Sequence, residues 1–203
     1  MGAQARYGLH MGKRRMNRVE VFNLATAELR DLNQRLHDLN PEQAEIPWRV
    51  LNPRSKHAVA VGVNVPVLID IEGHCGYYCA GMNQHAHITV HGMVGVGVAE
   101  NMMSGTVGIE GDASQYAGAT GRGGLLVIKG NASSRCGISM KGINIVVHGN
   151  IGHMSAFMAQ SGNLVVLGNA GDALGDSLYE AQLFVRGTVK SLGADCVKKE
   201  MRA

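Results

Sequence analysis

Aromatic and charged residues are scarce in this 203-residue chain, at 4% and 17% of the sequence. Large aromatic rings usually supply much of a globular core, so their scarcity excludes an ordinary core built around them. Glycine, by contrast, reaches 28 residues, and the hydrophobic set makes up 45%. The chain is long enough for one domain with a sizeable core. We therefore expect one folded domain in which small residues pack tightly.

Cysteines and long apolar runs are also few. Four cysteines occur, which favours a reducing compartment and predicts no disulfides. Residues 1–19 contain no apolar run of the length that a signal peptide or a membrane span needs, so we predict a cytoplasmic protein with no membrane partner. We interpret this stretch as a mobile N-terminal extension, in which Met16 is an alternative start.

Strong charge of one sign is absent as well. The net charge is only +3, and basic residues are scattered except for a cluster at Lys13, Arg14, Arg15 and Arg18. Proteins that bind nucleic acid usually concentrate positive charge on one face or along one stretch. The sequence therefore predicts no nucleic-acid partner.

One glycine column dominates the second part of the chain. Its members recur at a constant spacing of 19 residues: Gly73, Gly92, Gly111, Gly130, Gly149, Gly168 and Gly187. Repeats of this length are single supersecondary units that cannot bury their own apolar face and must stack on their neighbours. A glycine at the same place in every unit indicates either a positive φ or a corner where a side chain would collide with the next coil.

Two aliphatic columns precede each glycine, by four and by two residues. The first is Ile69, Ile88, Val107, Leu126, Ile145, Leu164 and Leu183, and the second is Ile71, Val90, Ile109, Ile128, Val147, Val166 and Val185. A spacing of two places both columns on one face of a short strand, which we predict to point inward. Two residues after the glycines, a column of small apolar residues from Cys75 to Val189 predicts a second inward segment. The residues just before the glycines are largely charged, and Glu110 and Lys129 should be neighbours there.

These columns predict an all-β fold, a right-handed single-stranded parallel β-helix of about seven 19-residue coils over residues 67–203. At about 4.8 Å per coil, the rod should be roughly 33 Å long. Leucine-rich repeats are excluded because their spaced leucines are absent, and a dinucleotide-binding fold is excluded because no crossover helix follows the glycines. Residues 20–66 should form an N-terminal cap segment. There Thr26 would cap one helix with a stripe from Leu29 to Leu39, and Asn40-Pro41 would end it.

Three groups of residues could in principle carry chemistry. Cys75 and Cys79 have a spacing compatible with a metal, but their registers favour small core residues. Cys136 shares the register of Cys79 three coils away, roughly 14 Å, which is too far for a disulfide. His85, His87 and His91 are interpreted as surface or interface residues, because no carboxylate or thiolate set completes a metal site. Residues 121–124 form a tight loop without the lysine and helix of a phosphate site. The residues by themselves therefore indicate a scaffold with no catalytic, cofactor or metal residue.

Several loop segments resemble the GXGXG domain family, which includes the C-terminal domain of the glutamate synthase large subunit and stand-alone relatives. The segments are Gly76–Gln84, Glu100–Gly105, Gly118–Gly124, Arg135–Gly142, Gly152–Met158 and Leu174–Ala181. The resemblance covers residues 20–202, and stand-alone chains of this kind are similar to the middle subunit of N-methylglutamate synthase (methylamine-glutamate N-methyltransferase).

The resemblance implies a non-catalytic assembly subunit with two partner chains. One partner is similar to a glutamine amidotransferase, and the other is a synthase chain that holds FMN and an iron-sulfur cluster. The complex would convert methylamine and L-glutamate to N-methyl-L-glutamate and ammonia. The alternative is the equivalent subunit of a glutamate synthase with an ammonia or glutamine donor. Candidate interface residues lie in the turns that project from the coils: Asn101, Met103, Arg122, Arg135, Lys141 and Tyr179.

Overall fold

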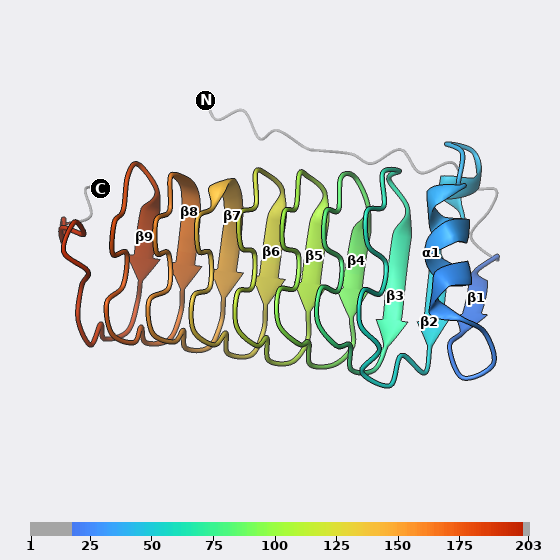
Figure 1. The fold of residues 1–203 in the computed structure, drawn as a ribbon, viewed down its shortest axis with the longest axis horizontal. Coiled ribbons are helices and arrows are strands. Elements are labelled where there is room, and N and C mark those ends of the chain that lie inside the picture. The colour runs from blue at the N-terminus through green and yellow to red at the C-terminus, as the bar shows by residue number, and fades with distance from the viewer. Residues whose placement is uncertain (1–17, 201–203) are drawn as a thin grey trace, which may run out of the picture.

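Nine parallel strands, hydrogen-bonded in chain order, form a single sheet in the computed structural model, which describes residues 18–200. The strands are β1 (Glu20–Asn23), β2 (Trp48–Leu51), β3 (Leu68–Glu72), β4 (His87–Val90), β5 (Thr106–Ile109), β6 (Leu125–Ile128), β7 (Lys141–Val147), β8 (Ser161–Val166) and β9 (Gln182–Val185). They lie side by side along one rod (Figure 1). The predicted extension, residues 1–19, falls outside the described residues apart from Arg18 and Val19.

The seven strands from β3 to β9 follow the predicted repeat. Partners in neighbouring strands are 19 residues apart, as in Ile69 with Ile88 and Val146 with Val165, except where a register shift at the start of β7 pairs Lys141 with Ser161. Both aliphatic columns point into the coil, and from β3 to β8 none of their members is more than 1% exposed. Alternating β-branched residues suit a pleated strand with one buried face, which is why these short segments become strands. The prediction of a parallel β-helix of about seven coils is confirmed.

A second ladder confirms the other inward column. Single parallel bridges join Cys75 to Val94 and continue through every coil to Val189. The six members before Val189 are 4–5% exposed. Each coil therefore closes around a core of aliphatic and small side chains.

The recurring glycine is required because the coils approach each other closely at this corner. A Cβ on Gly130 would lie 2.7 Å from the carbonyl oxygen of Gly111, and one on Gly168 would lie 2.5 Å from that of Gly149. The same atoms are joined by backbone hydrogen bonds, such as Gly130 N–H to Gly111 O at 3.1 Å. Positive φ explains only the first member, Gly73, at +126°. Of the two predicted reasons, collision with the neighbouring coil is the correct one from the second member onward.

Side chains next to the glycines form a ladder of hydrogen bonds. Asp112 Oδ1 accepts the backbone N–H of Asn131 at 2.6 Å, and Asn131 Oδ1 accepts that of Asn150 at 2.9 Å. The pattern continues through Asn169 to Thr188. Each amide oxygen thus satisfies a backbone donor one coil later, so the corner is held by side chains as well as by the backbone.

A different backbone conformation closes the coil opposite the sheet. In six successive coils, three alternating residues have left-handed φ values between +52° and +72°. They are Tyr78, Ala80, Met82, Gly97, Ala99, Asn101, Tyr116, Gly118, Thr120, Arg135, Gly137, Ser139, Met154, Ala156, Met158, Ala173, Gly175 and Ser177. We call this segment the left-handed tract. Fourteen of the eighteen residues in this list are not glycine, so the tract carries strain that its packing must offset.

Hydrogen bonds between coils compensate for that strain. The N–H groups of the tract point alternately to the following and the preceding coil: Tyr78 N–H to Val96 O at 2.8 Å, and Ala80 N–H to Val59 O at 2.9 Å. Small residues at the middle position, such as Ala80 and Gly118, are buried. The tract therefore stacks as regularly as the strands do.

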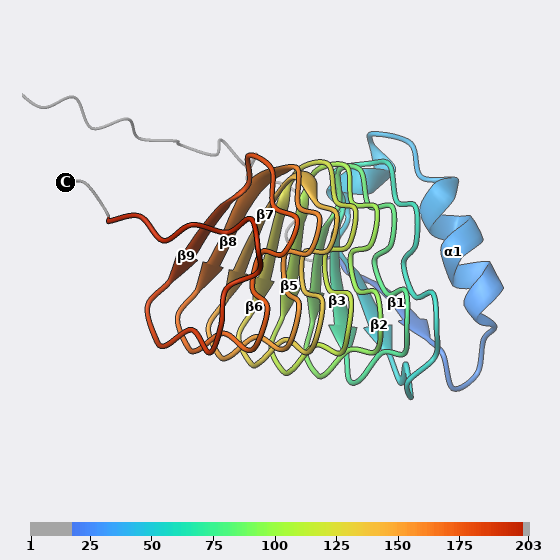
Figure 2. The same cartoon turned by 60° about the vertical axis from the view of Figure 1, so that its left-hand side comes forward.

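The N-terminal segment adds two strands to the sheet, because β1 pairs with β2 and β2 with β3. Helix α1 (Leu29–His37) and the short 3-10 helix η1 (Gln43–Glu45) lie between β1 and β2 in sequence. α1 stands at the N-terminal end of the stack (Figures 1 and 2). Its Asn33 amide donates to Ala58 O at 2.8 Å and accepts from Ala60 N–H at 3.0 Å. The helix therefore lies against Ala58 and Ala60, which also have left-handed φ values, of +56° and +54°.

Two local predictions for this helix are wrong. Its N-cap is Glu28 rather than Thr26, whose hydroxyl instead donates to Asn23 O at 3.3 Å within a turn. The helix ends at His37, with Asp38 as its C-cap, and so stops before Asn40. The predicted apolar stripe is nevertheless used, since Leu32 and Leu36 are buried.

The two ends of the core differ. At the N-terminal end, Arg35 forms an ion pair with Glu20 at 2.5 Å and lies 5.1 Å from the centroid of the Trp48 ring. At the C-terminal end, Val189 and Leu192 are 36% and 40% exposed, although their columns are buried in earlier coils. Polar groups thus cover one end of the apolar core, and part of the other end faces solvent.

Candidate subunit interface

The interior of the coils contains cysteines but no reactive thiol. Cys75, Cys79 and Cys136 are buried and free. A hydrogen bond with the Cys75 thiol, together with burial, raises the pKa of Cys79, and burial raises the pKa of Cys136 to about 12. Because the thiolate is the nucleophile and the metal ligand, the raised pKa values of Cys79 and Cys136 disfavour both roles for these two residues. The prediction that they are small core residues is confirmed.

The histidines are spread over the surface. His85, His87 and His91 are all exposed, and His91 Nε2 lies 3.1 Å from Asp70 Oδ1. Within residues 18–200, no group of three histidine, cysteine, aspartate or glutamate residues is placed to hold a metal ion. These three histidines therefore lie where the sequence indicated, on the outside of the coils.

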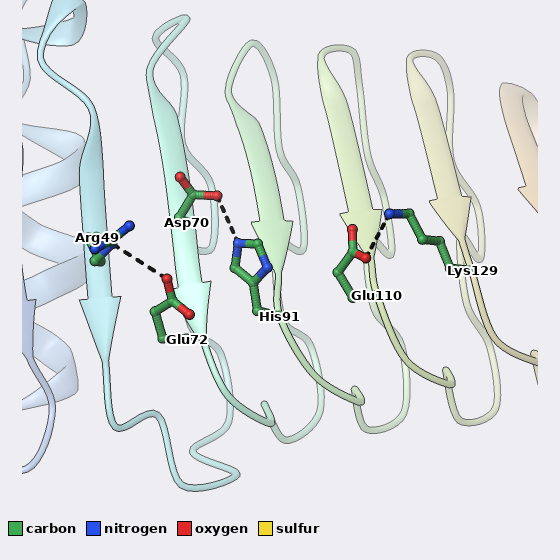
Figure 3. Close-up of polar contacts among 6 residues, drawn as sticks. All are labelled: Arg49, Asp70, Glu72, His91, Glu110 and Lys129. Carbon is green, nitrogen blue, oxygen red and sulfur yellow. Dashed lines mark hydrogen bonds and ion pairs between the residues drawn. The ribbon is translucent and has the colours of Figure 1, made fainter. Parts of the chain in front are cut away.

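Several charged side chains on the outer face of the sheet contact one another. Figure 3 shows three side-chain contacts between neighbouring coils: the ion pairs Arg49–Glu72 at 3.4 Å and Glu110–Lys129 at 2.7 Å, and the contact of His91 Nε2 with Asp70 Oδ1 at 3.1 Å. The predicted contact between Glu110 and Lys129 is confirmed. Because all six side chains are substantially exposed, each pair contributes little to stability, typically below about 1 kcal/mol.

Four of the six predicted interface residues occupy the same position in different coils and so form one row along the rod, which we call the corner column. It lies eleven residues after each of the first six corner glycines, at or just before the start of the next strand, and comprises Gln84, Met103, Arg122, Lys141, Gln160 and Tyr179. All six residues are exposed. Each donates its backbone N–H to the preceding coil, as Arg122 does to Met102 O and Lys141 to Gly121 O, both at 2.7 Å. The structure therefore brings Met103, Arg122, Lys141 and Tyr179 together on one edge of the rod.

The other two predicted residues, Asn101 and Arg135, lie beside this column in the left-handed tract and are half-buried. Thr120 donates its hydroxyl to Asn101 Oδ1 at 2.6 Å, and Asn101 donates its amide to the hydroxyl oxygen of Tyr78 at 3.3 Å. The Arg135 guanidinium carbon lies 5.9 Å from the centroid of the Tyr116 ring. These contacts link four successive coils and fix the polar side chains of the tract.

One carboxyl in the tract has a perturbed pKa. Partial burial raises the pKa of Glu100 above its ordinary value. A Cβ on the neighbouring Gly97 would lie 2.7 Å from Glu100 Oε2, so the glycine leaves room for this carboxylate against the tract. The sequence predicted neither the left-handed tract nor the role of Glu100, because the residue types of the tract do not indicate a left-handed backbone.

The hydrogen-bond ladder at the glycine corner was also missed, although it left a signal. Asp112, Asn131, Asn150 and Asn169 recur at the 19-residue period immediately after their glycines. Repeated asparagines facing one another across stacked coils are typical of amide ladders. The ladder is therefore structural, and it separates the sheet face from the remaining surfaces.

No helix in residues 18–200 has the length and apolar character needed to cross a bilayer.

Comparison with known proteins gives one informative relative. No family model and no solved structure matches the chain. The curated Protein GlxC of Rhizobium meliloti (strain 1021) is 72% identical over 182 residues, which cover 90% of this chain and 80% of that protein.

Proposed function

The chain belongs to the family of Protein GlxC, and from that premise we propose that it is a non-catalytic assembly subunit of a glutamate-synthase-like complex. The observation that carries the proposal is the filled core. From β3 to β8 the inward strand columns are at most 1% exposed, so the coils enclose side chains rather than a substrate. Solenoids whose interior is packed use their long outer surfaces for binding.

The proposed complex is N-methylglutamate synthase, which forms N-methyl-L-glutamate and ammonia from methylamine and L-glutamate. The loop segments quoted above support this choice through their similarity to the stand-alone GXGXG chains. The two partners are an amidotransferase-like chain and a synthase chain that carries FMN and an iron-sulfur cluster. This chain would hold the two in a fixed relation in the cytoplasm.

The test compares the chain alone with the chain produced together with the products of its neighbouring genes. We expect N-methylglutamate from methylamine and glutamate only in the joint preparation, and we expect the isolated chain to carry neither FMN nor iron. Turnover by the isolated chain would contradict the proposal.

The same assay addresses the alternative. A joint preparation that forms glutamate with ammonia or glutamine as donor, and ignores methylamine, would identify a glutamate synthase instead. The amine pocket would then lie in a partner chain, since this chain is expected to contribute no catalytic residue.

A further inference from the structure

Two cations of the corner column differ from two cations of the sheet face. Arg49 and Lys129, on the sheet face, each form an ion pair within the chain. Arg122 and Lys141, on neighbouring coils of the corner column, form no ion pair within the part of the chain that the structure describes. Both are exposed. With coils about 4.8 Å apart, the backbones that carry these two cations are neighbours.

The surroundings of these two cations leave them open to a large partner. Gly123 and Gly124 follow Arg122, and Gly142 follows Lys141. These glycines are structurally required, since a Cβ on Gly142 would lie 2.5 Å from Arg122 O and one on Gly123 would lie 2.6 Å from Met103 O. The residues that follow each cation in the chain therefore carry no side chain.

Apolar side chains in the same column complete the surface. Met103 is 46% exposed and Tyr179 is 69% exposed, one on each side of the cations along the rod. Methionine and tyrosine are enriched in protein interfaces, because methionine adapts its shape and tyrosine combines an apolar ring with a polar tip. Arginine is enriched there as well.

We infer that the corner column docks an acidic segment of a partner protein, with Arg122 and Lys141 facing its carboxylates and with Met103 and Tyr179 packing on either side. This inference rests on the proposed assembly function and names the face and the chemistry of one partner. Complementary charge fixes the register of such a contact and steers the encounter. A nucleic acid is a poorer fit, because affinity for phosphates requires many cations and the column offers two.

A charge-reversal experiment in the complex tests the inference. The tagged full-length chain is produced with the products of its neighbouring genes, purified, and the co-purifying chains are quantified by mass spectrometry. In the Arg122→Glu/Lys141→Glu variant, recovery of one partner chain should fall about tenfold or more, because like charges then face each other. The matched control, Arg49→Glu/Lys129→Glu, changes the net charge equally on the sheet face and should keep both partners.

A carbodiimide cross-link identifies the chemistry directly, since this reagent joins a lysine amine to a carboxylate in contact with it. Lys141 should be joined to an aspartate or glutamate of the lost partner. Full recovery of both partners by the Arg122→Glu/Lys141→Glu variant would overturn the inference and leave the assembly function standing. A wild-type chain that retains no partner would remove the assembly function and the inference with it. Nucleic acid that co-purifies with the wild-type chain and is lost in the variant would replace the acidic segment as the occupant.

Discussion

Replacing Gly130 by valine should destabilise the stack strongly. A Cβ at this position would lie 2.3 Å from Asp112 Oδ1 and 2.7 Å from Gly111 O. Neither atom can move freely, because Gly111 O accepts the Gly130 N–H at 3.1 Å and Asp112 Oδ1 accepts the Asn131 N–H at 2.6 Å.

The magnitude follows from these two contacts. Overpacking of a tight site costs about 1–3 kcal/mol. Displacing the Asp112 carboxylate breaks a charge-assisted hydrogen bond, which contributes about 1.5–3 kcal/mol. We therefore expect Gly130→Val to lower the free energy of unfolding by roughly 2.5–6 kcal/mol, a large share of the stability of an ordinary domain.

Gly108 provides the matched control. It lies on the outward face of β5, a Cβ there would meet only Ile88 O at 4.0 Å, and its φ lies outside the left-handed region. The equivalent positions of other coils hold Thr89 and Val127. Gly108→Val should therefore be neutral, or stabilising by up to about 1 kcal/mol through the unfolded chain.

Urea unfolding followed by far-UV circular dichroism measures both variants against the wild type. Repeat proteins can unfold in more than one step, so the midpoint and the slope of each transition are compared. Equal midpoints for Gly130→Val and Gly108→Val would refute the close-approach explanation of the glycine column.

Three further predictions concern thiols, pH and the side-chain ladder. In the native protein an alkylating reagent should modify Cys196, which is partly exposed, much faster than buried Cys136. Mass spectrometry should find all four thiols modified only after unfolding. Equal rates of modification for Cys196 and Cys136 would contradict the burial of Cys136. Burial raises the pKa of Glu100, so the folded state disfavours its charged form. The wild type should therefore be as stable as Glu100→Gln below the ordinary carboxyl pKa of about 4.3, and should become the less stable of the two as pH rises through the raised pKa. Urea midpoints at acidic and neutral pH measure this difference. Asn150→Ala removes the acceptor of the Asn169 N–H, bonded at 2.8 Å, and should cost about 1–2 kcal/mol in the same unfolding assay; an unchanged midpoint would show that the ladder contributes nothing.

Much of the fold was predictable because stacking imposes the period of the sequence on the structure. A coil that must pair with identical neighbours cannot gain or lose a residue without breaking both ladders, so the 19-residue glycine spacing identifies the repeat directly. The inward columns were equally readable, since a strand with one buried face alternates with a period of two. The contact of Glu110 with Lys129 follows from the same register.

The candidate site was predictable only in part. The sequence predicted that interface residues lie in the turns that project from the coils, and four of the predicted residues lie in the corner column. That Asn101 and Arg135 instead belong to the left-handed tract was not readable, because alanine, tyrosine, threonine and methionine occupy it and none of them favours positive φ. Hydrogen bonds to the coils on both sides hold them there, and such partners are remote in sequence.

The sequence by itself determined the repeat, its inward faces and the place of the corner glycines, because each depends on residues within one coil or on an unbroken period. The tertiary structure decided the rest. It decided that the glycines prevent collision rather than supply positive φ, that β1 and β2 extend the sheet, and that Arg49 and Lys129 are paired while Arg122 and Lys141 are not. Each of these depends on distances between atoms of different coils, and spacing along the chain does not fix such distances.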